Sequence, residues 1–314
     1  MKKTSKIYVA GHKGLVGSAI IRNLKSKGYS KIITKSRLEL DLLNQAAVDN
    51  FFATERPEYV FLAAAKVGGI MANSNFKADF IYENIQLQTN IIYAAYKYAS
   101  KKLLFLGSSC VYPKLSPQPI KEEYLLTGPL EPSNDAYAIA KIAGIAMCQS
   151  FRDQYQANFI AVMPTNLYGP NDNYSLTSSH VLPAMIRKFH EAKISGQIPV
   201  TLWGTGSAKR EFLHVDDLAD ALVYLMKNYN DREIINIGTG KDLTIMELAE
   251  IIQKVVGHKG KIIWDKSKPD GTPRKLLDVS KLHDLGWKHS IDLLSGIKAS
   301  YSWFIKNKHS LKER

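Results

Sequence analysis

The chain has 314 residues, of which 45% are hydrophobic and 23% charged, and this length suffices for one large globular domain or two smaller ones. No apolar run reaches the roughly 18 residues of a membrane span, so we expect no membrane contact. The net charge of +13 comes from scattered lysines without a dense basic stripe, which favours a solvated basic surface over nucleic-acid binding.

The N-terminal segment bears on the cellular location of the protein, and its cysteines bear on metal binding. The basic N-terminus is followed by a single short apolar run at 7–11, too short for a signal peptide, which predicts a cytoplasmic protein. Cys110 and Cys148 form no closely spaced pair, so we expect no metal site. The positive field of the chain would attract a small substrate that carries phosphates.

Apolar runs and helical periodicities alternate in chain order through the first half. The apolar runs predict strands at 6–10, 31–34, 59–63, 103–106 and 159–163. The periodic segments between them predict helices at 15–27, 44–54, 78–99 and 137–155. This alternation predicts an α/β fold, a Rossmann-type doubly wound parallel sheet with helices on both faces. Ligands of such a sheet bind beyond the carboxyl ends of its strands.

The pattern loosens in the second half, from about residue 164. Helices are predicted at 181–193 and 246–256, and the run 234–237 predicts a strand that rejoins the first sheet. We therefore expect a nucleotide-binding domain of residues 1–165 with about 213–242. Residues 166–212 and about 243–314 would form a smaller, interwoven substrate lobe.

A run of seven residues follows the first predicted strand and opens the first predicted helix: Gly11, His12, Lys13, Gly14, Leu15, Val16 and Gly17. Glycines at this spacing allow a tight turn and a close approach of the backbone to a pyrophosphate. The helix N-terminus adds free N–H groups and a partial positive charge. The loop therefore predicts a dinucleotide site.

The end of the second predicted strand distinguishes NAD from NADP. An acidic residue there would bind the ribose 2′-hydroxyl, but this chain has no acid before Glu39. Arg37 can bind a phosphate through two hydrogen bonds, and Lys13 adds charge from within the loop. Either cation could also be a solvated surface residue. Together they favour NADP(H) as the cofactor.

Tyr137 and Lys141 lie four residues apart on a predicted helix, which places both on one face. A lysine cation beside the phenol would lower the pKa of the tyrosine, so that Tyr137 could exchange a proton with a carbonyl oxygen near neutral pH. Ser108 follows the fourth predicted strand and could donate to the same oxygen, unless it only caps a turn. This set suits hydride transfer to a ketone.

Cys110 and His180 each allow two interpretations. A lone cysteine is usually an inert buried residue, but near a lysine it could act as a thiolate base. His180 precedes a predicted helix, where a histidine is more often a surface or capping residue than a catalyst. From the residues alone, both interpretations stay open.

A resemblance to a known family rests on eight runs that span the chain almost end to end: 10–17, 63–69, 106–113, 136–141, 163–169, 179–183, 210–217 and 268–274. They resemble the extended short-chain dehydrogenase/reductases and, within them, the GDP-L-fucose synthase family. The resemblance implies 3,5-epimerisation of GDP-4-keto-6-deoxy-D-mannose, followed by NADPH-dependent reduction of its C4 ketone. It also implies a homodimer, with Cys110 as the base and His180 as the acid of epimerisation.

The resemblance further implies two sets of binding residues. The cofactor set comprises residues 11–17, Arg37, Leu106, Gly107, Ser108, Ser109, Lys141, Pro164, Thr165, Asn166, Leu167 and His180. The set for the GDP-sugar comprises Lys188, Trp203, Arg210 and Asp270. Lys13 and Lys188 stand where arginine is common in the family, and lysine lacks the bidentate geometry of arginine. Trp203 could instead pack in a core, and Asp270 could be a turn residue.

Other functions remain to be weighed. A nucleotide-sugar dehydratase would have Asp-Glu where this chain has Ser109-Cys110, and a simple 4-epimerase needs no Cys-His pair. An NADPH-dependent reductase of a GDP-4-keto-6-deoxy-heptose is the nearest alternative. A non-catalytic NADP-binding protein would be expected to lack Tyr137, Lys141 or Cys110, and all three are present.

Overall fold

The computed structural model describes residues 1–176, 178–268 and 270–310; Pro269, within the run 268–274, lies outside the described residues. Six parallel strands form the main sheet, in the order β2-β1-β3-β4-β5-β9. They are β1 (Ile7–Ala10), β2 (Ile32–Ile33), β3 (Tyr59–Leu62), β4 (Lys102–Leu106), β5 (Phe159–Pro164) and β9 (Ile235–Ile237). The strand order reverses at β1, which is the switch point where ligands of doubly wound sheets bind. The predicted fold class is confirmed.

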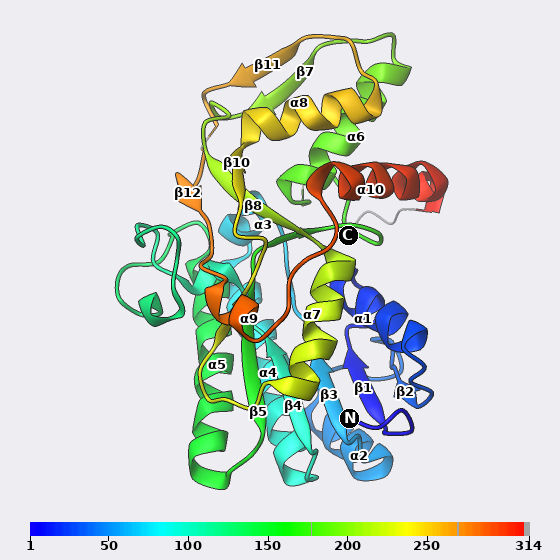
Figure 1. Cartoon of the computed structure of the whole chain (residues 1–314), viewed down its shortest axis with the longest axis vertical. Helices are drawn as coiled ribbons and strands as arrows, with labels where there is room; N and C mark the ends of the chain where they lie inside the picture. The colour runs from blue at the N-terminus through cyan, green and yellow to red at the C-terminus, as the bar shows by residue number, and fades with distance from the viewer. Residues whose placement is uncertain (177, 269, 311–314) are drawn as a thin grey trace.

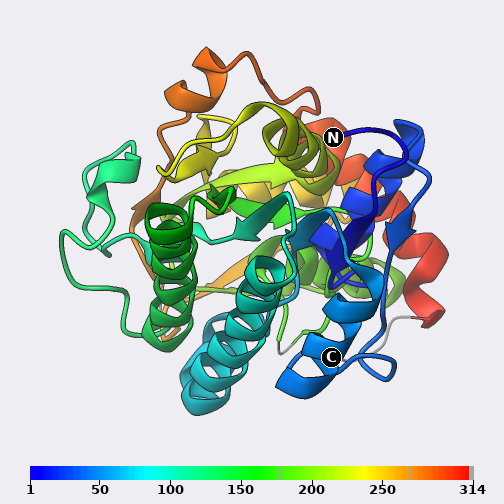
Figure 2. The same cartoon turned by 90° about the horizontal axis from the view of Figure 1, so that it is seen from below.

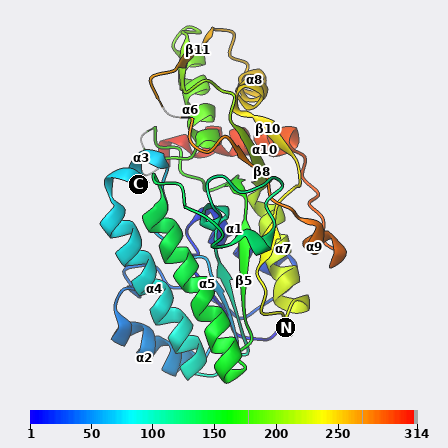
Figure 3. The same cartoon turned by 90° about the vertical axis from the view of Figure 1, so that its left-hand side faces the viewer.

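Helices cover both faces of this sheet (Figures 2 and 3). One face carries α1 (Leu15–Ser26) and α7 (Val215–Asn228), and the other carries α2 (Gln45–Glu55), α4 (Lys77–Lys97) and α5 (Asp135–Tyr155). Because both faces are covered, the strands are continuous apolar runs; all residues of β1, β4 and β5 are buried. The hydrophobic core therefore lies in two layers, one on each side of the sheet.

The boundaries of the predicted elements in this half agree with the structure to within about two residues. The strand predicted at 234–237 is β9, and it pairs with β5 as expected. The strand predicted at 31–34 is shorter, because β2 comprises only Ile32–Ile33. Helix α7 was not predicted, although its buried residues Leu218, Leu222 and Leu225 recur at helical spacing.

A smaller lobe lies beyond the carboxyl ends of the main strands (Figure 1). One of its sheets combines β6 (Asn166–Tyr168), β8 (Lys209–His214), β10 (Asp242–Thr244) and β12 (Arg274–Lys275), and β7 (Val200–Trp203) pairs with β11 (Ile262–Asp265). The helices α6 (Val181–Ile194), α8 (Ile245–Val256) and α10 (Leu293–Asn307) pack around a third hydrophobic core. Two short helices, α3 (Ile70–Asn75) and α9 (Ser280–Asp284), complete the fold.

Among the described residues, no helix is both long enough and apolar enough to cross a membrane. The longest helices, α4 and α5, have 21 residues each and carry charged side chains along their length.

Candidate active site

The glycine-rich loop between β1 and α1 shows which of its glycines the protein itself requires. Gly11 has a φ of +81°, and a Cβ there would lie 2.8 Å from the Ala64 backbone. A Cβ on Gly17 would lie 2.2 Å from the carbonyl oxygen of Gly11. Both glycines are therefore needed for the loop to pack.

Gly14 differs from the other two glycines of the loop. It is the N-cap of α1, no side chain caps this helix end, and the nearest atom to a Cβ at this position would be the Gly11 carbonyl oxygen at 3.4 Å. The protein therefore does not fill the space in front of Gly14. Uncapped N–H groups that face open space suit an anionic phosphate, so the loop fits the pyrophosphate of a dinucleotide.

The segment after β2 carries the residues that bear on cofactor choice. Glu39 is the first acid there, and its carboxylate accepts hydrogen bonds from the backbone N–H and the hydroxyl of Ser36, at 2.8 and 2.5 Å. Arg37 is exposed between them, and no described residue forms an ion pair with it. A fixed acid and an unpaired arginine suit the 2′-phosphate of NADP better than the 2′-hydroxyl of NAD.

Lys141 is buried, with 3% of its surface exposed. Its Nζ donates a hydrogen bond to the Leu106 carbonyl at 2.8 Å and lies 4.8 Å from the centroid of the Phe105 ring. Because no carboxylate offsets this burial, the pKa of Lys141 falls to about 7. The lysine is therefore near its titration midpoint at neutral pH.

The pKa of Tyr137 is raised, mainly by burial and then by the nearby Cys110, while a hydrogen bond with Ser108 opposes the rise. The sequence-based expectation of a lowered pKa is therefore wrong for this structure. The physical reason is that the Lys141 Nζ bonds the Leu106 carbonyl and lies 5.8 Å from the centroid of the Tyr137 ring, so it does not offset the desolvation of the phenol. Tyr137 stays protonated at neutral pH, as an acid must.

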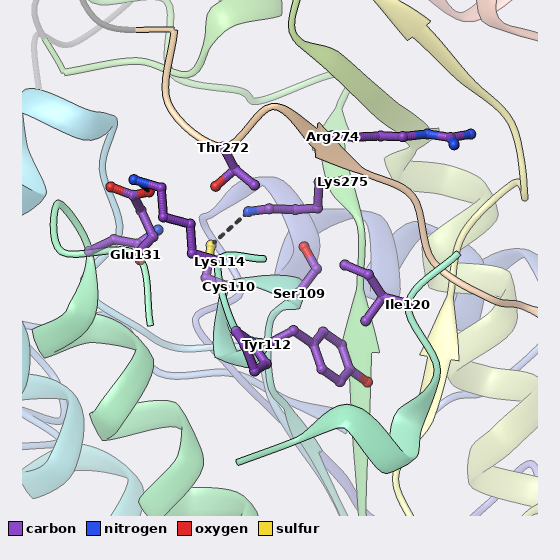
Figure 4. Close-up of a pocket in the computed structure, with 11 residues that line it drawn as sticks. Ser109, Cys110, Tyr112, Lys114, Ile120, Glu131, Thr272, Arg274 and Lys275 are labelled. Carbon is purple, nitrogen blue, oxygen red and sulfur yellow. Dashed lines mark hydrogen bonds and ion pairs between the residues drawn. The ribbon is translucent and has the colours of Figure 1, made fainter. Parts of the chain in front are cut away.

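Cys110 lies in a 3₁₀ turn (Ser109–Val111) directly after β4, and the Ser108 hydroxyl caps this turn by accepting from the Cys110 N–H at 3.2 Å. On its other side, the Sγ of Cys110 accepts a hydrogen bond from the Nζ of Lys275 at 3.6 Å, across a pocket (Figure 4). His180 is the N-cap of α6; part of its surface is exposed, and its pKa is lowered by desolvation from the surrounding protein and by the charge of Lys275. Lys275 thus interacts with both Cys110 and His180.

The candidates for nucleotide-sugar binding belong to the smaller lobe. The Nζ of Lys188 lies 6.0 Å from the centroid of the Trp203 ring, which is 43% exposed. Arg210 donates to the Asp270 carbonyl at 3.3 Å, and the Asp270 carboxylate accepts from the backbone N–H of Thr205 at 2.8 Å. The four predicted substrate-binding residues thus fall into two neighbouring pairs, Lys188 near Trp203 and Arg210 bonded to Asp270.

The remaining predicted cofactor residues line the carboxyl ends of the main strands. Leu106 ends β4 and Gly107 to Ser109 follow it, while Pro164 ends β5, Thr165 joins the two strands, and Asn166 and Leu167 begin β6. The Asn166 side chain donates to the Glu211 carbonyl at 2.8 Å, which ties this segment to β8. These segments therefore meet the glycine-rich loop at one edge of the sheet, as the topology requires.

Comparison with known proteins shows the family of the chain. The model of the NAD dependent epimerase/dehydratase family matches residues 7–238. The chain belongs to this family. The sequence is 58% identical to "GDP-L-fucose synthase 1" of Arabidopsis thaliana, over 97% of this chain and 94% of the relative. It is 53% identical to the GDP-L-fucose synthase of Escherichia coli K12, over 96% and 97%.

The chain is also similar to solved structures. A GDP-mannoheptose C4 reductase from Campylobacter jejuni, with NADP bound, superposes with a TM-score of 0.90. It is 44% identical and covers 97% of this chain and 99% of its own. The fold is therefore shared with a protein described as a GDP-mannoheptose C4 reductase.

The sequence analysis did not identify Lys275 as a site residue. The residue follows the run 268–274 but lies 165 positions from Cys110, and a lone lysine on a short strand carries no signal of its own. It also missed Lys268, whose Nζ lies 5.8 Å from the centroid of the Trp203 ring. The pairing of β12 with β8 brings Lys275 to the site, and the pairing of β11 with β7, which sets Asp265 opposite Trp203, brings Lys268 near Trp203.

Proposed function

We propose that this chain converts GDP-4-keto-6-deoxy-D-mannose to GDP-L-fucose, by 3,5-epimerisation followed by NADPH-dependent reduction of the C4 ketone. One observation carries the proposal: the Tyr137 phenol interacts with Ser108 and Cys110, and Cys110 shares Lys275 with His180. A proton donor for a ketone and two groups for carbon acid–base chemistry thus meet beside the dinucleotide loop. The identities of 53% and 58% to GDP-L-fucose synthases support the same reaction.

NADP(H) is the cofactor that the chain's own residues fit. The uncapped N-terminus of α1 and the open space at Gly14 suit the pyrophosphate, and Arg37 suits the 2′-phosphate. When bound, NADPH supplies the hydride for the C4 carbon.

Reduction requires a donor at the C4 oxygen as the hydride arrives. Tyr137, which its environment keeps protonated, gives the proton to this oxygen, and the Ser108 hydroxyl donates a hydrogen bond to it. Lys141 holds the end of β4 through Leu106, and its Nζ lies 5.8 Å from the centroid of the Tyr137 ring.

Epimerisation uses the same ketone. The C4 carbonyl acidifies the hydrogens on C3 and C5, and the electron pair left by each proton moves onto the C4 oxygen as an enolate. The Cys110 thiolate removes the proton, and His180 returns one on the opposite face of the ring. Ser108 and Tyr137 donate to the enolate oxygen, so both reactions use one set of donors.

The second candidate function is reduction of a GDP-4-keto-heptose without a change at C3 or C5. The 44% identity to a GDP-mannoheptose C4 reductase favours it. In that case Cys110 and His180 would have no catalytic role, and the reduction would require only Tyr137, Lys141 and Ser108.

The test supplies the purified protein with NADPH and either GDP-4-keto-6-deoxymannose or the corresponding heptose derivative. We expect NADPH oxidation with the hexose, and NMR of the product should show GDP-L-fucose. A product with the mannose configuration at C3 and C5 would mean reduction alone. Turnover restricted to the heptose would replace the proposal with the second candidate.

We further propose which part of the chain binds the cofactor and which part binds the substrate. Residues 1–165 with about 213–242 would bind NADP(H), and residues 166–212 with about 243–314 would bind the GDP-sugar. Two strand pairings support this division: β9 pairs with β5 of the main sheet, and β6 pairs with β8 of the lobe. The reaction site would lie between them.

The proposal also includes a homodimer through α4 and α5. These helices lie side by side on one face of the molecule (Figure 3), and Tyr82 and Tyr93 of α4 and Tyr155 of α5 are exposed. Apolar and aromatic side chains on two adjacent helices suit a four-helix contact between two copies. Light scattering of the wild type and of Tyr93→Glu should show a dimer and a larger monomer fraction, respectively.

A further inference from the structure

Lys275 occupies an unusual electrostatic position in the pocket beside Cys110. Its Nζ donates to the Cys110 Sγ at 3.6 Å, and no carboxylate of the described residues forms an ion pair with it. The neighbouring cations differ in this respect. Lys114 pairs with Glu131 at 2.9 Å, and Arg274 pairs with Asp242 at 2.6 Å.

The backbone around Lys275 is held on both sides. Strand β12 pairs in parallel with β8, which sets Lys275 opposite Arg210. The following residue, Leu276, donates to the Gln118 side chain at 2.8 Å, and its carbonyl accepts from the Ile120 N–H at 2.7 Å. A lysine side chain is flexible, but a fixed backbone on a strand limits where its ammonium can reach. Figure 4 shows the Lys275 ammonium directed at the sulfur.

We propose that Lys275 is a positioning residue for epimerisation, whose ammonium holds Cys110 as the thiolate that removes the C3 and C5 protons. The inference rests on the proposed function. A cation within about 4–6 Å of an acid favours its ionised form, and a thiol becomes a base only as the thiolate. In the step itself the C–H bond breaks, an S–H bond forms, and the electron pair moves onto the C4 oxygen. Lys275 keeps its own proton throughout.

Other charged or titratable groups surround the same sulfur. Arg210 on β8 interacts with Cys110 electrostatically, and Tyr137 on α5 faces it as a neutral phenol. Lys114 and Glu131 line the same pocket, where they offset each other. Lys275 is the cation that contacts the sulfur directly, so its removal should change the thiolate more than the removal of any neighbour.

Lys275 also has a consequence for His180. Its positive charge helps to keep the imidazole neutral, as the lowered pKa of His180 indicates. A neutral imidazole beside an ammonium can receive a proton from solvent and release it readily to an enolate carbon. Replacing Lys275 with a neutral residue should therefore shift both limbs of the pH profile of epimerisation to higher pH.

The experiment follows deuterium incorporation at C3 and C5 of GDP-4-keto-6-deoxymannose in D₂O without NADPH, from pH 5.5 to 9.5. We expect Lys275→Met to lower the exchange rate at pH 7 at least about 10-fold and to move the rising limb to higher pH, because the thiolate would lose the cation that contacts it. Lys275→Arg, which keeps the charge, should restore most of the rate. Arg274→Met, on the same strand, should leave the profile unchanged.

A second readout separates this role from a loss of folding. With NADPH present, the ketone that is not epimerised is reduced directly, so Lys275→Met should shift the product from GDP-L-fucose toward GDP-rhamnose while NADPH affinity and Tm stay at wild-type values. An unchanged pH profile of exchange and an unchanged product ratio in Lys275→Met would overturn the inference. It would also be overturned if Lys275→Met lowered the rates of exchange and reduction equally and Lys275→Arg did not restore them. Absence of exchange in the wild type itself would instead overturn the proposed function.

Discussion

Lys141 on α5 donates its hydrogen bond to the Leu106 carbonyl at the end of β4, and not to the phenol of Tyr137. The lysine thus joins the helix that carries the proton donor to the strand that precedes Ser108 and Cys110. This contact links the helix of Tyr137 to the strand that leads to Ser108 and Cys110.

The buried charge of Lys141 should make stability depend on pH in a defined window. Its pKa is about 7 in the folded state, against about 10.5 for an exposed lysine, so between these values the unfolded chain binds more protons. The free energy of unfolding should therefore rise with pH from about 7 upward through this group. Lys141→Met should lack this contribution and should be more stable than the wild type at pH 7.

Urea denaturation of both proteins at pH 7 and pH 9 measures the effect. Lys102 is also buried with a pKa of about 8, so the relevant quantity is the difference between variant and wild type. An identical pH dependence in the two proteins would show that Lys141 is not charged in the manner described. The variant should also lose most of its reductase activity.

Tyr137→Phe should abolish proton donation to the C4 oxygen. We expect reduction to fall roughly 10²- to 10⁴-fold, the usual range for a general acid. Because the pKa of Tyr137 is raised, the wild-type reduction rate should show no limb from this phenol between pH 6 and 9. Stopped-flow NADPH oxidation checks both statements; a variant that reduces at the wild-type rate would remove Tyr137 from the mechanism.

Cys110→Ser should impair epimerisation while NADPH stays bound. A serine hydroxyl is a far weaker acid than a thiol, so the proton of C3 or C5 would lack a base. The product should change from GDP-L-fucose to the 4-reduced sugar with the original configuration at both carbons. NMR of the product decides the matter, and undiminished formation of GDP-L-fucose would show that another residue is the base.

Gly14→Ala should separate cofactor binding from folding. A Cβ at Gly14 meets only the Gly11 carbonyl at 3.4 Å, so Tm should change little, but the methyl group would occupy space left for the pyrophosphate. We expect NADPH affinity to fall at least about 10-fold, with the loss measured by fluorescence titration. Gly17→Ala is the contrast, because its Cβ would clash with Gly11 and should lower Tm as well. Wild-type affinity in Gly14→Ala would place the pyrophosphate elsewhere.

Arg37→Ala tests the choice of NADPH over NADH. Loss of a phosphate contact should raise the KM for NADPH roughly 10-fold, because charge-assisted hydrogen bonds of this kind contribute about 1.5–3 kcal/mol. The KM for NADH should not change, since NADH lacks the 2′-phosphate. Lys31→Ala removes another exposed cation nearby and serves as the control. An equal rise of the NADPH KM in both variants would mean that positive charge in general, and not a contact of Arg37 with the 2′-phosphate, affects NADPH binding.

The sequence was sufficient for the main sheet because its strands are buried on both faces. Such strands are continuous apolar runs, and Gly11 and Gly107 directly follow two of them, β1 and β4. The same reasoning failed in the smaller lobe, where β8 and β12 carry charged residues and have no such run. Their pairing depends on contacts between distant segments.

The electrostatics of the site were the least predictable part. Spacing alone places Lys141 one turn from Tyr137, but whether the ammonium reaches the phenol depends on competing acceptors such as the Leu106 carbonyl. Lys275 reaches Cys110 only because Glu211 and Gln118 bind the residues that follow it on the chain. No local pattern encodes either contact.

The most direct test of the account is the isotope pattern of the product formed in D₂O with unlabelled NADPH. If epimerisation and reduction occur in one pocket as described, NMR will show GDP-L-fucose with deuterium at C3 and C5 and hydrogen at C4. A reduced sugar that carries hydrogen at C3 and C5 would contradict the account, because the ketone would then have been reduced without any proton having left the ring carbons.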